Sequence, residues 1–114
     1  MADLRLSEFV ETVRLACDRS DLVIGYNIRI LDNVTVKIRV PLGVKAFIDV
    51  YFNPENGNCS FALIKGGKRI YGADNAFVGW HFHPFESPDQ HLPCSELAFG
   101  DFLHRVEEWA MREA

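Results

Sequence analysis

Apolar residues near the start of the chain recur at intervals of three and four. They are Leu6, Phe9, Val10, Val13 and Cys17, a spacing that places side chains on one face of an α-helix. Ser7 is a candidate N-cap for this helix, because its hydroxyl can accept a hydrogen bond from a free backbone N–H. The polar run 18–21 is typical of a connection. We therefore expect an amphipathic helix followed by a turn.

The period then changes from helical spacing to two. Apolar and polar residues alternate over 24–30, 34–40 and 44–52, which predicts three strands with one buried and one solvated face. Because the turns between them are short, the strands are expected to pair antiparallel. The three rows predicted to be buried are Ile24, Tyr26, Ile28 and Ile30; Val34, Val36, Ile38 and Val40; and Val44, Ala46, Ile48, Val50 and Phe52.

The second half of the chain predicts more strands and a second helix. Turn-forming residues at 53–58 and the pair Gly66-Gly67 separate strands expected at 59–65 and 68–73, and a shorter one at 78–83. Residues 84–95 contain three prolines and no periodicity, so a long loop is expected there. A last apolar stripe predicts a closing helix: Phe99, Phe102, Leu103, Val106, Trp109 and Ala110. The prediction is one α+β domain over residues 1–114, an antiparallel five- to six-stranded meander sheet with an N-terminal and a C-terminal helix packed on one face.

Composition narrows the class of protein. Of 114 residues, 48% are hydrophobic and 25% charged, which is typical of a folded domain. No apolar run reaches the roughly 20 residues that cross a bilayer, so no membrane association is expected. Cys17, Cys59 and Cys94 form no CxxC pair and are odd in number, which favours reduced thiols and a cytoplasmic protein. The net charge of −4 excludes a uniformly basic surface but leaves room for one basic face.

The richest polar chemistry lies in residues 80–94, which hold three of the four histidines. On a strand, His81 and His83 would point to one face and could form an acid/base pair. His91 and Cys94 could fold back to complete a zinc site with them, because imidazole and thiolate are natural zinc ligands. Zinc is therefore possible, although the acid/base reading requires no cofactor. The alternative is a loop packed by aromatics and prolines, with no chemistry.

Two further groups of residues are candidates for the same chemistry. Asp74 could orient a histidine through its ring N–H, and Arg69 could stabilise a phosphate; the alternative is an ordinary turn at 74–75. His104, in the closing helix, is interpreted as a surface residue. The solvated face of the meander mixes basic and aromatic residues that suit phosphates and bases: Arg29, Thr35, Lys37, Arg39, Lys45, Phe47, Asp49 and Tyr51. A plain solvated face or a homodimer contact are the alternatives.

The second half of the chain resembles the TumE-like family of prokaryotic toxin–antitoxin toxins. The resemblance covers about residues 58–110 and lies in Asp74-Asn75 after a hairpin, the histidines at 81, 83 and 91, and the helix motif at 97–103. It implies a toxin that inhibits translation by acting on RNA and is held inactive by a cognate antitoxin protein. The chain departs from many family members in having no two consecutive histidines, so a relative with another role is an alternative.

The segment 79–84 also resembles the metal-binding His-x-His-Pro strand of the JAMM metalloproteases. That family takes its acidic zinc ligand from a Ser-x-x-Asp pattern on the following helix. Here Ser95 is followed at that spacing by Ala98. A methyl group cannot ligate zinc, so the resemblance does not extend to a protease site.

Two hypotheses follow. In the first, the chain is a ribonuclease-type toxin with His81 and His83 as acid and base, assisted by Asp74 and Arg69. The residues expected to bind its RNA are Tyr51, Tyr71, Lys68 and Arg39. In the second, it is a non-enzymatic interaction domain, stabilised or not by zinc on His81, His83, His91 and Cys94, that binds a partner protein.

Overall fold

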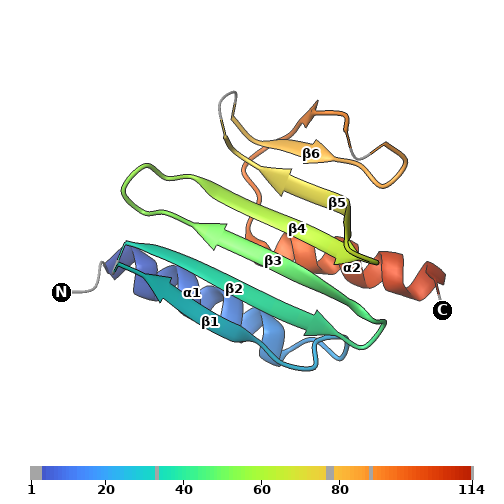
Figure 1. Ribbon diagram of the computed structural model, residues 1–114, viewed down its shortest axis with the longest axis horizontal. Coiled ribbons are helices and arrows are strands. Elements are labelled where there is room, and N and C mark those ends of the chain that lie inside the picture. Colours follow the sequence, from blue (N-terminus) through green and yellow to red (C-terminus); the bar gives the residue numbers. More distant parts are fainter. Residues whose placement is uncertain (1–3, 33, 77–78, 88, 114) are drawn as a thin grey trace.

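The computed structural model describes residues 4–32, 34–76, 79–87 and 89–113, and within them the chain forms two α-helices and seven β-strands (Figure 1). The helices are α1 (Leu4–Asp18) and α2 (Phe99–Glu113). The strands are β1 (Asn27–Leu31), β2 (Thr35–Leu42), β3 (Ala46–Phe52), β4 (Cys59–Lys65), β5 (Lys68–Asp74), β6 (His81–His83) and β7 (Leu92–Pro93). Neither helix in these ranges is long and apolar enough to cross a bilayer.

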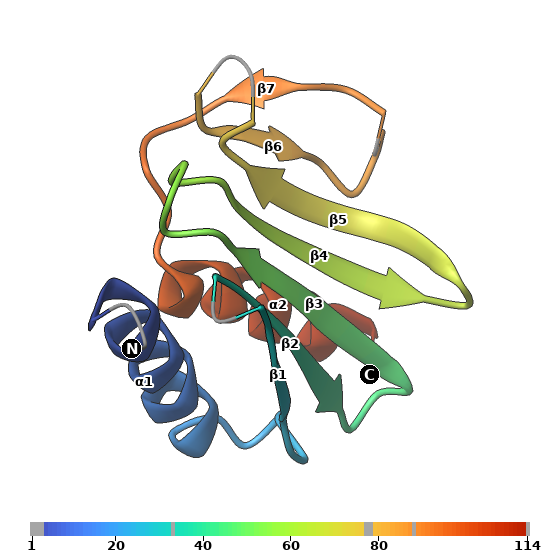
Figure 2. The same cartoon turned by 60° about the vertical axis from the view of Figure 1, so that its left-hand side comes forward.

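All strands belong to one sheet whose spatial order follows the chain. Each pairs antiparallel with the next, from β1 to β7. Both helices lie on the same side of this sheet, and the other face is left open (Figures 1 and 2). The predicted α+β class, the antiparallel meander and the placement of the helices are confirmed.

The strand count is seven where five to six were predicted. The additional strand, β7, has two residues and pairs with β6 inside the segment expected to be a loop. Two residues carry no periodicity, and Pro93 donates no backbone N–H, so nothing in the pattern distinguishes this edge strand from a loop. The strand expected at 78–83 is observed as His81–His83; residue 78 lies outside the described residues.

The core lies between the sheet and the helices. The predicted rows of β2 and β3 are buried from Val36 to Val40 and from Ala46 to Val50. All six residues of the predicted stripe on α2 are buried as well. Phe61 of β4 joins the layers, with its ring centroid 5.4 Å from that of Phe102 and 5.7 Å from that of Phe99.

Two local predictions are wrong. Ile24 and Ile30 were assigned to a buried row, yet they are 69% and 50% exposed. Alternation shows which residues share a face but not whether another layer covers that face. Ile30 lies in β1, an edge strand that pairs only with β2, and Ile24 lies before β1, outside the sheet strands. Ser7 is not an N-cap, because α1 includes residues from Leu4 onward; a serine within the first turns of a helix gives the same local signal as one before it.

Candidate active site on the open face of the sheet

The histidines and Asp74 are brought together by the pairing of β5 with β6. Asp74 is directly opposite His81, and Gly72 is directly opposite His83. Tyr71, immediately before Gly72 in β5, points toward α2, where its ring centroid lies 5.2 Å from that of Phe102. Because side chains alternate along a strand, Gly72, Asp74 and both histidines share the open face.

Asp74 bridges the two histidines with its two carboxylate oxygens. Its Oδ1 lies 3.2 Å from Nε2 of His81, and its Oδ2 lies 3.0 Å from Nε2 of His83. Oδ1 also accepts the backbone N–H of Ala76 at 3.1 Å. The side chain of Asp74 is 19% exposed and those of His81 and His83 only 6% and 4%. The backbone N–H of Ala76 therefore holds the carboxylate in place, and the carboxylate in turn holds both histidine rings.

The ring of His81 faces an oxygen acceptor at each nitrogen. Its Nδ1 lies 2.9 Å from the carbonyl oxygen of Gly79, and its Nε2 faces the Asp74 carboxylate. A carbonyl and a carboxylate can only accept. The doubly protonated ring, which has two N–H donors, satisfies both contacts.

The ring of His83 has a different hydrogen-bond environment. Its Nδ1 lies 3.3 Å from Nη2 of Arg69, and a guanidinium can only donate. Nδ1 of His83 therefore accepts this bond, while its Nε2–H donates to Asp74. The neutral ring satisfies both contacts, so the two histidines are held in arrangements that suit different protonation states.

His91 is an exposed residue immediately before β7, and it completes the group. Its ring centroid lies 4.9 Å from that of His81 and 4.6 Å from that of His83. One ring nitrogen from each of the three histidines lies within 4.8 Å of the others. This spacing permits a shared metal ion, and equally a shared proton or phosphate.

A cavity of about 690 Å³ opens over this group on the sheet. It brings together six of the residues singled out in the sequence: Tyr51, Arg69, Asp74, His81, His83 and His91. We call these six residues the histidine site. They come from β3, β5, β6 and the segment before β7, so the meander assembles residues that are up to 40 positions apart.

Three of the predicted RNA-binding residues lie outside the histidine site. Tyr71 is 5% exposed in the core, stacked on Phe85 at 4.2 Å between ring centroids, and burial raises the pKa of its hydroxyl. Arg39 binds Asp49 through two hydrogen bonds on β3. Lys68 is an exposed residue at the turn between β4 and β5.

Cys94 does not join the three histidines that could hold a metal, so the proposed four-residue zinc set is not assembled. Its backbone N–H donates to the carbonyl of Trp80, and burial raises the pKa of its thiol. The spacing of Cys94 from His91 in the sequence gives no indication of which face of the sheet its side chain takes. Cys17 and Cys59 are buried free thiols, and His104 is a surface residue, as the sequence predicted.

Two residues beside the histidine site were not recognised in the sequence. Gly72 matters because a Cβ there would lie 3.1 Å from Cδ of Arg69 and 3.2 Å from the carbonyl oxygen of Phe61. An isolated glycine inside a strand is a signal for such a close approach. Ser60, opposite Asp74 in β4, has no comparable signal, because serine is common on solvated strands.

Comparison of the chain with protein-family models, with curated proteins and with solved structures finds no match. The geometry of the histidine site is therefore the basis for proposing a function.

Proposed function

We propose that this chain is a metal-independent ribonuclease that cleaves RNA at the histidine site. The observation that carries the proposal is the Asp74 carboxylate between two histidines that it holds in different hydrogen-bond environments. General acid–base catalysis needs one group that takes a proton and another that gives one. Here Nδ1 of His83 faces a donor and can accept a proton, whereas both ring nitrogens of His81 face acceptors.

The reaction assigns one role to each histidine. His83 takes the proton of the ribose 2′-hydroxyl on Nδ1, and the 2′-oxygen attacks the adjacent phosphorus. As the bond from phosphorus to the 5′-oxygen breaks, His81 gives its Nε2 proton to that oxygen. The products are a 2′,3′-cyclic phosphate and a 5′-hydroxyl, and proton exchange with water restores both rings. Asp74 acts as a positioning residue for both.

Arg69 supports phosphate chemistry in particular. Its guanidinium lies against the Nδ1 of His83 that is to act as the base. On binding a phosphate oxygen it would uncover that nitrogen and stabilise the additional negative charge of the phosphorane. The same movement of Arg69 would thus bind the substrate and free Nδ1 of His83 to act as the base.

The biological role is proposed from the resemblance to the TumE-like toxins. A nuclease of this kind would act in the cytoplasm, inhibit growth, and require an antitoxin protein to hold it inactive. Of the features that carry the resemblance, the Asp74-Asn75 motif and the three histidines lie at or beside the histidine site, which is where an antitoxin would have to act on it. The helix motif at 97–103 lies on the other face of the sheet.

The test is cleavage of single-stranded RNA by purified protein with EDTA present. We expect a 2′,3′-cyclic phosphate product, and a loss of rate of about 10²- to 10⁴-fold in His81→Ala and in His83→Ala. His104→Ala is the matched control, because this histidine is 73% exposed on α2. Inducible expression should inhibit growth with the wild type and the control but not with the double variant. Cleavage that survives in the folded double variant would refute the assignment.

A zinc site is the second candidate, and the three converging histidines favour it. The Nδ1–H of His81 is already held by a carbonyl, as is common for zinc-bound histidines. Against it, the Arg69 guanidinium lies 3.3 Å from His83 Nδ1 and would repel a second cation. Stoichiometric zinc in the purified wild type and its loss in His91→Ala, with cleavage abolished by EDTA, would establish this candidate instead.

A further inference from the structure

A row of directly paired residues runs across the open face from the first strand to the histidine site. Consecutive pairings place Arg29 opposite Lys37, Lys37 opposite Tyr51, Tyr51 opposite Ser60, Ser60 opposite Asp74, and Asp74 opposite His81. Directly opposite residues project to the same face of a sheet. We call the four residues of this row that come before Asp74 the cross-strand row: Arg29, Lys37, Tyr51 and Ser60.

The basic end of the row has an unusual pairing. Arg29 and Lys37 are both exposed and lie directly opposite each other, an arrangement of like charges that destabilises a sheet. Neither takes part in an ion pair among the residues that the structure describes. In the neighbouring row, Arg39 lies opposite Asp49 and binds it. One row is thus neutralised within the protein, whereas the other presents two positive charges without a counter-charge.

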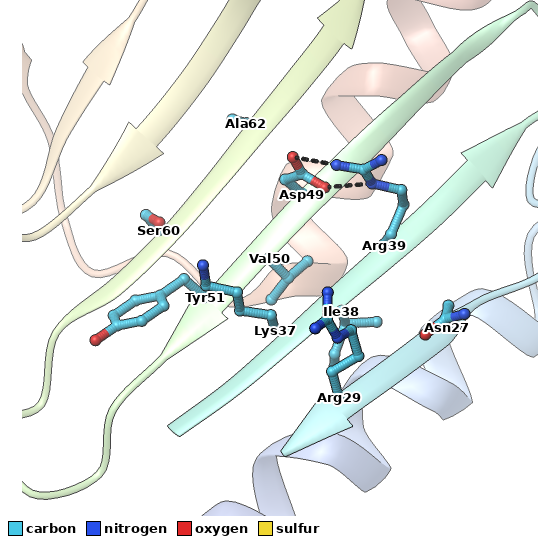
Figure 3. A pocket seen from close by; sticks show the side chains of 10 residues that line it. All are labelled: Asn27, Arg29, Lys37, Ile38, Arg39, Asp49, Val50, Tyr51, Ser60 and Ala62. Carbon is cyan, nitrogen blue, oxygen red and sulfur yellow. Dashed lines mark hydrogen bonds and ion pairs between the residues drawn. The ribbon is translucent and has the colours of Figure 1, made fainter. Parts of the chain in front are cut away.

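The row also lies in a hollow of the surface. A groove of about 480 Å³ is formed over β1 to β4 by side chains that include Arg29, Lys37, Tyr51 and Ser60. Figure 3 shows Arg29, Lys37 and Tyr51 rising from three neighbouring strands beside the Arg39–Asp49 pair. Tyr51 and Ser60 also line the cavity of the histidine site. The groove and the cavity are therefore neighbours that share two residues.

Tyr51 sets the kind of ligand that fits. Its half-buried ring stands between the cations and the histidines. Aromatic side chains on a positively charged track are the pattern of proteins that bind single-stranded nucleic acid, because the ring stacks on an unpaired base. In a duplex the bases already stack on one another and do not reach a flat sheet. From Lys37 to Asp74 is three strand spacings of roughly 4.8 Å, about 14 Å in all, the span of a few nucleotides.

We infer that the cross-strand row binds the single-stranded RNA substrate. The RNA lies perpendicular to the strands β1–β5. Its scissile phosphate is at the histidine site, a neighbouring base stacks on Tyr51, and a more distant phosphate binds Arg29 and Lys37. This inference rests on the proposed ribonuclease function. It adds the class of substrate, the direction in which it lies and a second binding region well away from the reacting atoms.

The experiment measures binding separately from cleavage. A short fluorescent 2′-O-methyl RNA cannot be cleaved, because its 2′-oxygen carries no proton. For the wild type we expect binding that weakens with salt and that a duplex of the same sequence does not match. In Arg29→Gln/Lys37→Gln the slope of log affinity against log salt should fall by about 1.4, since single strands give about 0.7 per phosphate contact. Tyr51→Leu should weaken binding about ten-fold with an unchanged slope.

The control has the same change of charge on the other side of the molecule. Arg19→Gln/Arg112→Gln removes two exposed arginines near the C-terminal ends of α1 and α2, and it should leave both affinity and slope unchanged. If both double variants lower the slope equally, the attraction is general and the row is not the binding region.

The outcomes distinguish this inference from the proposed function. If cleavage depends on His83 but binding does not depend on Arg29 and Lys37, the cross-strand row is not the binding region and the proposed nuclease activity is unaffected. Binding lost in the row variants without any cleavage by the wild type supports the row and refutes the nuclease. No binding of single-stranded RNA by the wild type overturns the row, and would leave the two cations for an acidic segment of a partner protein.

Discussion

The two faces of the sheet differ in what their side chains satisfy. On the covered face, Phe61, Phe99 and Phe102 are at most 2% exposed and pack on one another. On the open face, carboxylate, imidazole and guanidinium groups bind one another, and the described residues include no buried side-chain N or O atom without a hydrogen-bond partner. The first face holds the fold together by burial, and the second arranges charges. Replacements on the two faces should therefore separate stability from chemistry.

The largest effect on stability is expected on the covered face. Phe102→Ala removes a fully buried ring between Phe61 and Tyr71, and such truncations cost about 3–5 kcal/mol of the free energy of unfolding. Urea unfolding measures it. Met111→Ala on the same helix is the control, because Met111 is 79% exposed, and it should change stability by less than about 0.5 kcal/mol. A loss for Phe102→Ala as small as that of the control would show that the helix is not part of the core.

The covered face is also the part that could be predicted from the sequence. Periodicity identified the buried residues of β2, β3 and α2, because burial against another layer is what produces the pattern. It failed at Ile24 and Ile30, where the pattern is present and the covering layer is not. It missed β7, because two residues and a proline show no period.

The open face was predictable only in its residue types. The sequence singled out His81, His83, Asp74 and Arg69, and the register of β5 with β6 places them in contact. The sequence did not show that one carboxylate bridges both rings, nor that Cys94 stays apart. These depend on strand register and on which face a side chain takes, and a shift of one residue reverses both.

The next effect should fall on chemistry alone. Asp74→Asn keeps the shape of the side chain, and its amide can accept from His83 and donate to Nε2 of His81. The proton that His81 must give would then be absent, so cleavage should fall by about 10²-fold or more. The unfolding midpoint in urea should change far less than in Phe102→Ala. Asp18→Asn, at the exposed end of α1, is the control and should retain the wild-type rate.

A large loss of stability in Asp74→Asn with an unchanged rate per folded molecule would contradict this division between the faces. Asp74 would then be a structural anchor, and the two histidines would have no common positioning residue.

A smaller effect on both stability and cleavage is expected at Gly72, where the backbone of β5 packs closely against Arg69 and β4. Gly72→Ala places a methyl group 3.1 Å from Cδ of Arg69 and 3.2 Å from the Phe61 carbonyl oxygen. Arg69 must move and β4 must give way slightly, which should cost about 1 kcal/mol of stability. Cleavage should fall about ten-fold because His83 and Arg69 lose their alignment. Gly100→Ala is the control, since a Cβ there meets nothing within 4 Å. Equal rates in the two alanine variants would show that the close packing at Gly72 does not position the site.

The smallest effect concerns Cys59, which lies on the covered face next to Ser60 on the open one. Burial raises the pKa of its thiol from 9.0 to about 12. Above pH 9 the unfolded chain therefore loses this proton while the folded chain keeps it. The stabilising contribution is complete below pH 9 and declines as the pH rises toward 12.

Urea unfolding at pH 8 and pH 10 measures this decline, which we expect to be about 1 kcal/mol for this thiol. Cys59→Ala should be less stable at both values because it leaves a cavity, but the difference between them should shrink. Cys94→Ala is the matched control, because that thiol is only partly buried and its removal should lower the pH dependence by less than the removal of Cys59 does. A pH dependence that Cys59→Ala leaves unchanged would mean that the thiol ionises as readily in the folded chain as in the unfolded one. Cys59 would then be accessible to solvent and would not belong to the core of the covered face.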